Sequence, residues 1–243
     1  MKSYQKSKYF FRLFLFLCLC SHQACSYLPE EQIITDVVNV SETKDYIDIT
    51  PNWSSFSKTG LVFYPGGLVD PHAYTETLSR FAVSGIGHRV IIVKMPGNLA
   101  VLDKNQGAYM FEDKPGLNRW VIGGHSLGGA MACSAVKKFP EHFSGLVLLA
   151  AYPSKNTDIS DWNGSVLSIT GQFDKIIDKQ LLEERKINLS PDAIYETISG
   201  GNHSLFGNYG HQKGDGIASI TREEQVKETI NLIQELFSDN DWD

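Results

Sequence analysis

The sequence is poor in cysteine. It holds four cysteines in 243 residues, and three of them, Cys18, Cys20 and Cys25, fall within the first 25 positions. If the chain is cleaved near Cys25, the remaining domain keeps Cys133, with Cys25 where that residue is retained. A disulfide framework is therefore not expected, and the fold must depend on its hydrophobic core. Cys133 stands among alanines and a methionine, which predicts a small buried residue.

Positive charge is also scarce. Lys and Arg number 22 against 28 Asp and Glu, a formal net charge of -6. This leaves no basic face, so nucleic-acid binding is excluded. The sequence lacks H-E-x-x-H and C-x-x-C motifs, and we expect neither a metal nor a cofactor. A hydrophobic fraction of 42% and a charged fraction of 21% are typical of one ordinary globular domain, here residues 26–243.

The first 25 residues differ from the rest. Basic side chains, from Lys2 to Arg12, precede an apolar run at 13–20 and a short polar segment. This order predicts a signal peptide at 1–25 and export to the bacterial periplasm, the cell envelope or the medium. The apolar run is shorter than the roughly 20 residues that span a bilayer. A short membrane anchor and a buried helix are the alternatives.

Two types of signal stay open. Ala24 before Cys25 resembles the end of a bacterial lipoprotein box, although His22 stands where such boxes usually carry leucine. In the lipoprotein type, a lipidated Cys25 would tether the protein to a membrane. In the ordinary type, the domain would be released.

Strand-like and helix-like segments alternate after residue 57. Strands covered on both faces appear as β-branched runs, and helices show apolar residues three or four apart. Such alternation predicts an α/β fold with a mostly parallel sheet, helices on both faces and a site at the carboxyl ends of the strands. We expect strands at 46–50, 61–64, 89–94, 120–123, 146–150, 166–170 and 194–198, and helices at 74–83, 127–139, 178–187 and 223–237.

Ser126 is the candidate nucleophile. It lies in Gly-His-Ser-Leu-Gly at 124–128, between a predicted strand and a predicted helix. A G-x-S-x-G in this position is typical of a nucleophile elbow, where the helix N-terminus can face an oxyanion. The alternative is a glycine-rich turn with an incidental serine.

A serine nucleophile needs a base, and the base needs a group that orients it. His203 follows the strand 194–198 and is the first choice as base; His211 is the alternative. Asp174 is the first carboxylate after the strand 166–170 and is the candidate acid, with Asp178 as its competitor. For either aspartate, a solvated turn or a helix cap is the other interpretation.

Two backbone amides should form the oxyanion hole. One is that of Leu127, directly after the nucleophile. The other comes from the loop after the strand 61–64, where Gly67 is our choice and Leu68 the second.

Four motifs in this order resemble the α/β-hydrolase superfamily: YPGG at 64–67, GGHSLGG at 123–129, GQFD at 171–174 and GGNH at 200–203. The likeness is to small, lid-poor bacterial members related to dienelactone hydrolases and carboxylesterases. It implies the α/β-hydrolase fold, with a sheet of about seven or eight strands. Dienelactone hydrolases carry a cysteine nucleophile, so Ser126 moves this chain towards the esterases.

These observations predict a serine hydrolase that cleaves a small or medium carboxylic ester through an acyl-enzyme. A lipase, thioesterase, acyltransferase or peptidase on the same triad, and a non-catalytic surface lipoprotein, remain alternatives. The short connection at 152–165 leaves no room for a long lid. The glycine-rich stretch 206–218 is expected to be a structural loop, with substrate contact by Tyr209 or Gln212 as the alternative.

Overall fold

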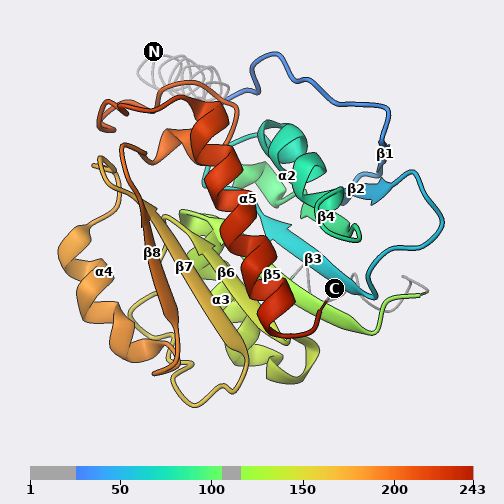
Figure 1. Ribbon diagram of the computed structural model, residues 1–243. Helices are drawn as coiled ribbons and strands as arrows, with labels where there is room; N and C mark the ends of the chain where they lie inside the picture. The colour runs from blue at the N-terminus through green and yellow to red at the C-terminus, as the bar shows by residue number, and fades with distance from the viewer. Residues whose placement is uncertain (1–25, 106–115, 243) are drawn as a thin grey trace, which may run out of the picture.

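A computed structural model describes residues 26–105 and 116–242; the predicted signal segment 1–25 lies outside them. An eight-stranded sheet crosses the molecule, and helices lie on both of its faces (Figure 1). Strands β3 to β8 run parallel, while β1 and β2 pair antiparallel at one edge. The strand order is β1-β2-β4-β3-β5-β6-β7-β8, with bounds β1 (Val38–Glu42), β2 (Tyr46–Pro51), β3 (Thr59–Tyr64), β4 (Arg89–Val93), β5 (Arg119–His125), β6 (Gly145–Leu149), β7 (Ser165–Gly171) and β8 (Ile194–Ile198).

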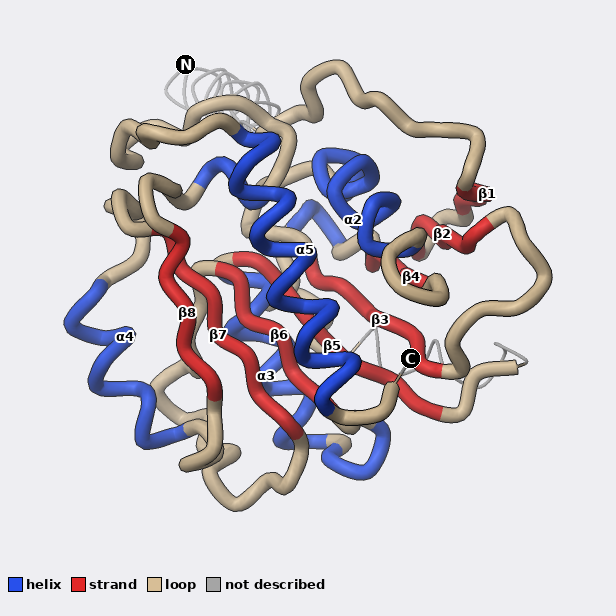
Figure 2. Tube along the Cα trace, in the orientation of Figure 1, coloured by secondary structure: helices blue, strands red, loops and turns tan. Residues whose placement is uncertain are grey.

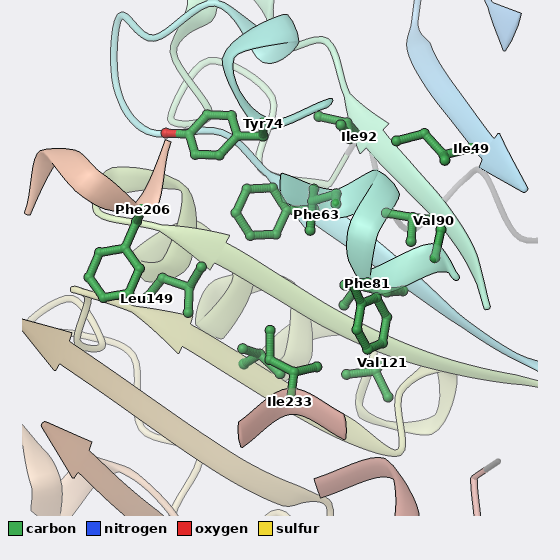
Figure 3. Packing of buried hydrophobic residues seen from close by; sticks show 14 of the residues in the cluster. Ile49, Phe63, Tyr74, Phe81, Val90, Ile92, Val121, Leu149, Phe206 and Ile233 are labelled. Atoms are coloured by element: carbon green, nitrogen blue, oxygen red, sulfur yellow. The ribbon is translucent and has the colours of Figure 1, made fainter. Parts of the chain in front are cut away.

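The central strands are apolar on both sides because each face of the sheet has its own core. Along β3, Leu61 and Phe63 join one hydrophobic cluster, and Val62 and Tyr64 join the other. This follows from the two-residue period of a strand. Figure 3 shows part of the first cluster, with Phe81 and Ile233 beside Val121. A sheet covered on both faces excludes water from the middle of the molecule.

The helices divide between the two faces. Helices α2 (Thr75–Ala82) and α5 (Arg222–Asp239) cover the first cluster, and α3 (Leu127–Lys138) covers the second; α4 (Lys179–Arg185) lies beside β8 (Figures 1 and 2). Helix α5 begins with a capping box, in which Thr221 and Glu224 exchange hydrogen bonds.

Most of the expected elements are confirmed, including a sheet of eight strands. Strand β1 was not expected from the sequence, since Val38 is its one buried residue and no apolar alternation marks it. The helix expected at 74–83 begins at Thr75, because Asp70 caps a separate 3-10 turn at Pro71–Tyr74. Cys133 is buried with a free thiol, as expected.

The two ends of the described chain lie at opposite ends of the sheet. Tyr27 donates its amide to Leu68 O at 2.7 Å and accepts from the Asp70 amide at 2.9 Å, beyond the carboxyl end of β3. Trp242 instead packs over Gly145, the first residue of β6, where an added Cβ would lie 2.4 Å from the indole.

Candidate active site

Ser126 lies in the sharp turn between β5 and α3. Its backbone has φ 53° and ψ -122°, a conformation that non-glycine residues rarely adopt. Its amide still donates to Leu149 O at 2.9 Å, and its carbonyl accepts from the Ala130 amide at 3.2 Å. The turn is therefore tied to strand β6 on one side and to helix α3 on the other, and the side chain remains partly exposed.

The flanking glycines allow this turn. A Cβ on Gly124 would lie 2.6 Å from the Gly128 carbonyl carbon, and one on Gly128 would lie 2.1 Å from Tyr64 O. Both distances are too short for any side chain. The turn therefore requires glycine at both positions for steric reasons. The absence of a side chain at Gly128 also lets the turn pack directly against the end of β3.

His203 and Asp174 come together from the loops after β8 and β7. His203 Nδ1 lies 2.8 Å from Asp174 Oδ2, and both side chains are buried. The second oxygen, Asp174 Oδ1, accepts the amides of Ile176 at 2.8 Å and Ile177 at 2.9 Å. The carboxylate is thus fixed at both oxygens and can hold the imidazole in one tautomer. The other ring nitrogen, His203 Nε2, is buried and has no hydrogen-bond partner within the described part of the chain.

Asp178 and His211, the alternative candidates for the acid and the base, lie elsewhere in the structure. Asp178 caps α4, where its side chain accepts the Leu181 amide at 3.0 Å. His211 is exposed. Neither contacts the pair formed by His203 and Asp174.

Ser126 and His203 line the same pocket, which has a volume of about 330 Å³. Its wall is mostly apolar and comes from the start of α3, the end of β6 and the segment after Asp174. The lining residues include Leu127, Ala130, Met131, Ala151, Ile176 and Ile177.

The loop after β3 lies against the start of α3. A Cβ on Gly67 would lie 3.0 Å from Leu127 Cδ2. The neighbouring amides are occupied, since Gly66 donates to Tyr74 Oη at 3.0 Å and Leu68 donates to Asn98 O at 2.8 Å. Gly67 is therefore the candidate donor of this loop, beside Leu127, whereas Leu68 is not.

His125 is a participant that sequence reasoning missed. Its ring is buried behind the elbow, with its centroid 4.4 Å from that of His203. Its Nδ1 lies 2.8 Å from Tyr74 Oη, and the same oxygen accepts a hydrogen bond from the Gly66 amide at 3.0 Å. Burial, and next the charge of His203, hold the pKa of His125 well below its usual value. Burial also raises the pKa of Tyr74. The pair joins the loop of Gly67 to the elbow as neutral groups.

The return loop, residues 206–218, packs against this site from the side of α5. Tyr209 is buried and faces Tyr27 and His125, and it does not line the pocket of Ser126. Gln212 donates its amide to Ser204 Oγ at 2.9 Å. The arrangement agrees with a structural loop.

The sequence matches the family model described as "Alpha/beta hydrolase family" over residues 60–227. The chain belongs to the alpha/beta hydrolase family. This span contains Ser126, Asp174, His203 and the loop of Gly67. The protein is therefore a hydrolase, and its eight-stranded sheet is that of the family. The sequence has no match among curated proteins.

Solved structures agree with the fold. A predicted CIB-like hydrolase from Thermoplasma acidophilum has a TM-score of 0.60 at 18% identity, over 82% of this chain and 99% of that chain. A thermostable esterase from Pseudomonas putida has a TM-score of 0.58 at 14% identity, over 84% of each chain. An esterase from Pyrobaculum calidifontis has a TM-score of 0.56 at 17% identity, over 97% of this chain and 94% of that chain.

Residues 26–105 and 116–242 contain neither a metal-binding cluster nor a membrane-spanning helix. No cluster of three His, Cys, Asp or Glu side chains there could hold a metal ion. Within the same residues, no helix is both long and apolar enough to cross a membrane.

Proposed function

We propose that this hydrolase is a serine carboxylesterase in which Ser126 is the nucleophile, His203 the base and Asp174 the group that orients the base. One observation supports this most. The Nδ1 side of His203 is occupied by Asp174, while Nε2 is left without a partner in a site that shares its pocket with Ser126. A buried nitrogen without a partner is costly, and a serine hydroxyl is the group that would satisfy it.

In the proposed reaction, Ser126 Oγ attacks the ester carbonyl and His203 Nε2 takes its proton. The proton then passes to the leaving alcohol, and an acyl-enzyme remains on Ser126. Water attacks this ester by the same proton transfers in reverse. Asp174 orients the imidazole and stabilises the imidazolium. The amides of Leu127 and Gly67 stabilise the oxyanion, with the N-terminus of α3 contributing its partial positive charge.

The pocket favours a small or medium apolar acyl group. Its volume of about 330 Å³ lies near the lower end of the usual range for ligand sites. Met131, Ile176 and Ile177 line it, and no Asp, Glu, Lys or Arg side chain does so among the described residues. We therefore expect short acyl esters to be better substrates than long-chain lipids.

The test is a fluorophosphonate adduct mapped by mass spectrometry on the folded protein, with p-nitrophenyl esters of increasing acyl length assayed alongside. We expect the adduct on Ser126, its loss in Ser126→Ala, and turnover that falls beyond a medium acyl length. A folded protein with neither adduct nor turnover would contradict the proposal and favour a binding role. Turnover of thioesters or transfer to an alcohol above hydrolysis would instead favour a thioesterase or an acyltransferase on the same triad.

Export is part of the proposal, since residues 1–25 have the order of a signal peptide. Lipidation is tested by growing a bacterial host that expresses the full chain with labelled palmitate. Label on the wild type and its absence from Cys25→Ser would support a membrane tether. A released, unlabelled protein that begins near Ser26 would support an ordinary signal.

A further inference from the structure

Asp215 carries a buried carboxylate that is not part of the proposed triad. It accepts hydrogen bonds both from the loop of His203 and from the loop of Asp174. Its Oδ2 accepts the amide of Ser204 at 2.8 Å and the hydroxyl of Ser204 at 2.6 Å. Its Oδ1 accepts the amide of Lys175 at 3.3 Å. Ser204 directly follows His203, and Lys175 directly follows Asp174. One side chain thus connects the residues next to the base and next to the acid.

Gly216 extends the connection through the backbone. Its amide donates to Asp215 Oδ1 at 2.7 Å, and its carbonyl accepts from Asn202 Nδ2 at 2.7 Å. A Cβ on Gly216 would lie 1.8 Å from Phe173 O, so the two backbones are in direct contact. Asn202 precedes the base and Phe173 precedes the acid. The return loop therefore contacts both residues that flank each of these two side chains.

The carboxylate is held in its charged form. Burial alone would raise the pKa of Asp215, but hydrogen bonds from Ser204, Lys175 and Gly216 outweigh it and lower the pKa. An anion that accepts four hydrogen bonds is a stiffer connector than a neutral group of the same size, because charge-assisted hydrogen bonds are shorter and stronger.

We propose that Asp215 is a positioning residue, which fixes the acid loop and the base loop at the separation that the bond between His203 and Asp174 requires. This inference rests on the proposed triad and adds the return loop to it. Asp215 does not line the pocket and touches no substrate. It acts through Ser204 and Lys175.

The test compares Asp215→Asn with Ser204→Ala and with the double variant. An asparagine has one acceptor oxygen instead of two, so donors on one loop lose their partner, while the size is kept. We expect kcat for a short p-nitrophenyl ester to fall at least about 10-fold in Asp215→Asn, with KM within about twofold, since small misplacements of catalytic groups slow the reaction strongly. Ser204→Ala should lose less, and the two effects should not add. The matched control is Asp239→Asn, an exposed aspartate on α5, which should leave kcat unchanged.

A second readout does not depend on turnover. The proton shared by His203 Nδ1 and Asp174 should give a far-downfield NMR resonance in the wild type. We expect it to broaden or vanish in Asp215→Asn at a temperature where circular dichroism shows the variant fully folded, and to persist in Asp239→Asn.

The outcomes separate this inference from the proposed function. A wild type that neither labels on Ser126 nor turns over esters would contradict the function, and the resonance would still decide on Asp215. A folded Asp215→Asn with wild-type kcat and an unchanged resonance would overturn the positioning role, even if its melting temperature fell. A variant that does not fold leaves Ser204→Ala to decide, with the same two readouts.

Discussion

The hydroxyl of Tyr74 joins His125 Nδ1 at 2.8 Å across 51 residues of sequence, and the same oxygen accepts the Gly66 amide at 3.0 Å. This places one phenol between the loop of Gly67 and the residue before Ser126. Tyr74 lies in the first hydrophobic cluster, among side chains such as Phe63 (Figure 3). The loop of Gly67 and the turn at Ser126 are thus connected through the core.

Replacing this hydroxyl should weaken both the fold and the site. In Tyr74→Phe, the Gly66 amide and His125 Nδ1 lose their partner, and a buried group left unsatisfied costs about 1–3 kcal/mol. We expect the free energy of unfolding to drop by that amount and kcat to fall while KM changes little. Urea denaturation and ester kinetics measure the two effects. Tyr195→Phe is the control, because the ring of that partly exposed tyrosine keeps its contact with Lys186 Nζ. Equal effects in the two variants would contradict the role of the Tyr74 hydroxyl.

Substitution of Asp174 and of Asp178 should have clearly different effects on kcat. Asp174→Asn cannot hold the base in the working tautomer, and kcat should fall about 10³- to 10⁴-fold. Asp178→Asn should change kcat by less than about twofold, since asparagine is an equally good helix cap. Comparable losses in both variants would mean that the acid has been assigned to the wrong aspartate.

His125 should make the fold less stable in mild acid. Its pKa in the folded protein is held well below 6.5 by burial, and next by the charge of His203. The unfolded chain therefore binds a proton that the folded protein refuses. The contribution of the neutral His125 ring to the free energy of unfolding is complete above about pH 6.5. It is lost as the pH falls below that value, by at most about 1.4 kcal/mol per pH unit.

The measurement is urea denaturation of the wild type and of His125→Gln between pH 7.5 and pH 5. We expect the advantage of the wild type over the variant to shrink towards pH 5. His211→Gln, at an exposed position, should show a constant difference across the same range. An NMR titration of the wild type in which the His125 ring protonates near pH 6.5 would refute the argument.

Glu76 and Glu223 pair with the same arginine, Arg80, but differ in burial. The buried carboxylate of Glu76 pairs with Arg80 at 3.0 Å and with Arg222 at 3.0 Å, while the largely exposed Glu223 pairs with the same Arg80. Glu76→Gln removes the buried carboxylate and leaves Arg222 without its pair to Glu76, so it should lower the free energy of unfolding by about 3 kcal/mol. Glu223→Gln should cost at most about 1 kcal/mol. Thermal and urea denaturation of both variants provide the measurement. Similar losses of unfolding free energy in the two variants would show that burial of the carboxylate does not determine its contribution to stability.

Elements governed by local rules could be predicted from the sequence. The sharp turn at Ser126 was predicted because a strand, two glycines at fixed offsets and a helix all stand within one short segment. The buried strands were found because a covered sheet requires continuous apolar runs. Strand β1 was missed because four of its five residues are exposed and show no pattern.

Contacts between distant segments could not be predicted in this way. Tyr74 and Asp215 are polar groups whose most distant hydrogen-bond partners lie 51 and 40 residues away in the sequence. Nothing in the residues around either of them differs from an ordinary aromatic core position or an ordinary loop aspartate. His125 was noticed only as a neighbour of the nucleophile, because its contact with the His203 ring depends on how the base loop folds back.

The opposite placement of the two ends has a practical meaning for any fusion or immobilisation of this enzyme. Tyr27 is bonded to Leu68 and Asp70, one residue from the amide of Gly67, whereas Trp242 rests on Gly145 at the far end of the sheet. A bulky partner joined ahead of Tyr27 would lie beside the loop of Gly67, at the end of the sheet that carries Ser126. The same partner joined after Trp242 would lie at the opposite end of the sheet from Ser126, so a surface or reporter belongs at the carboxyl end.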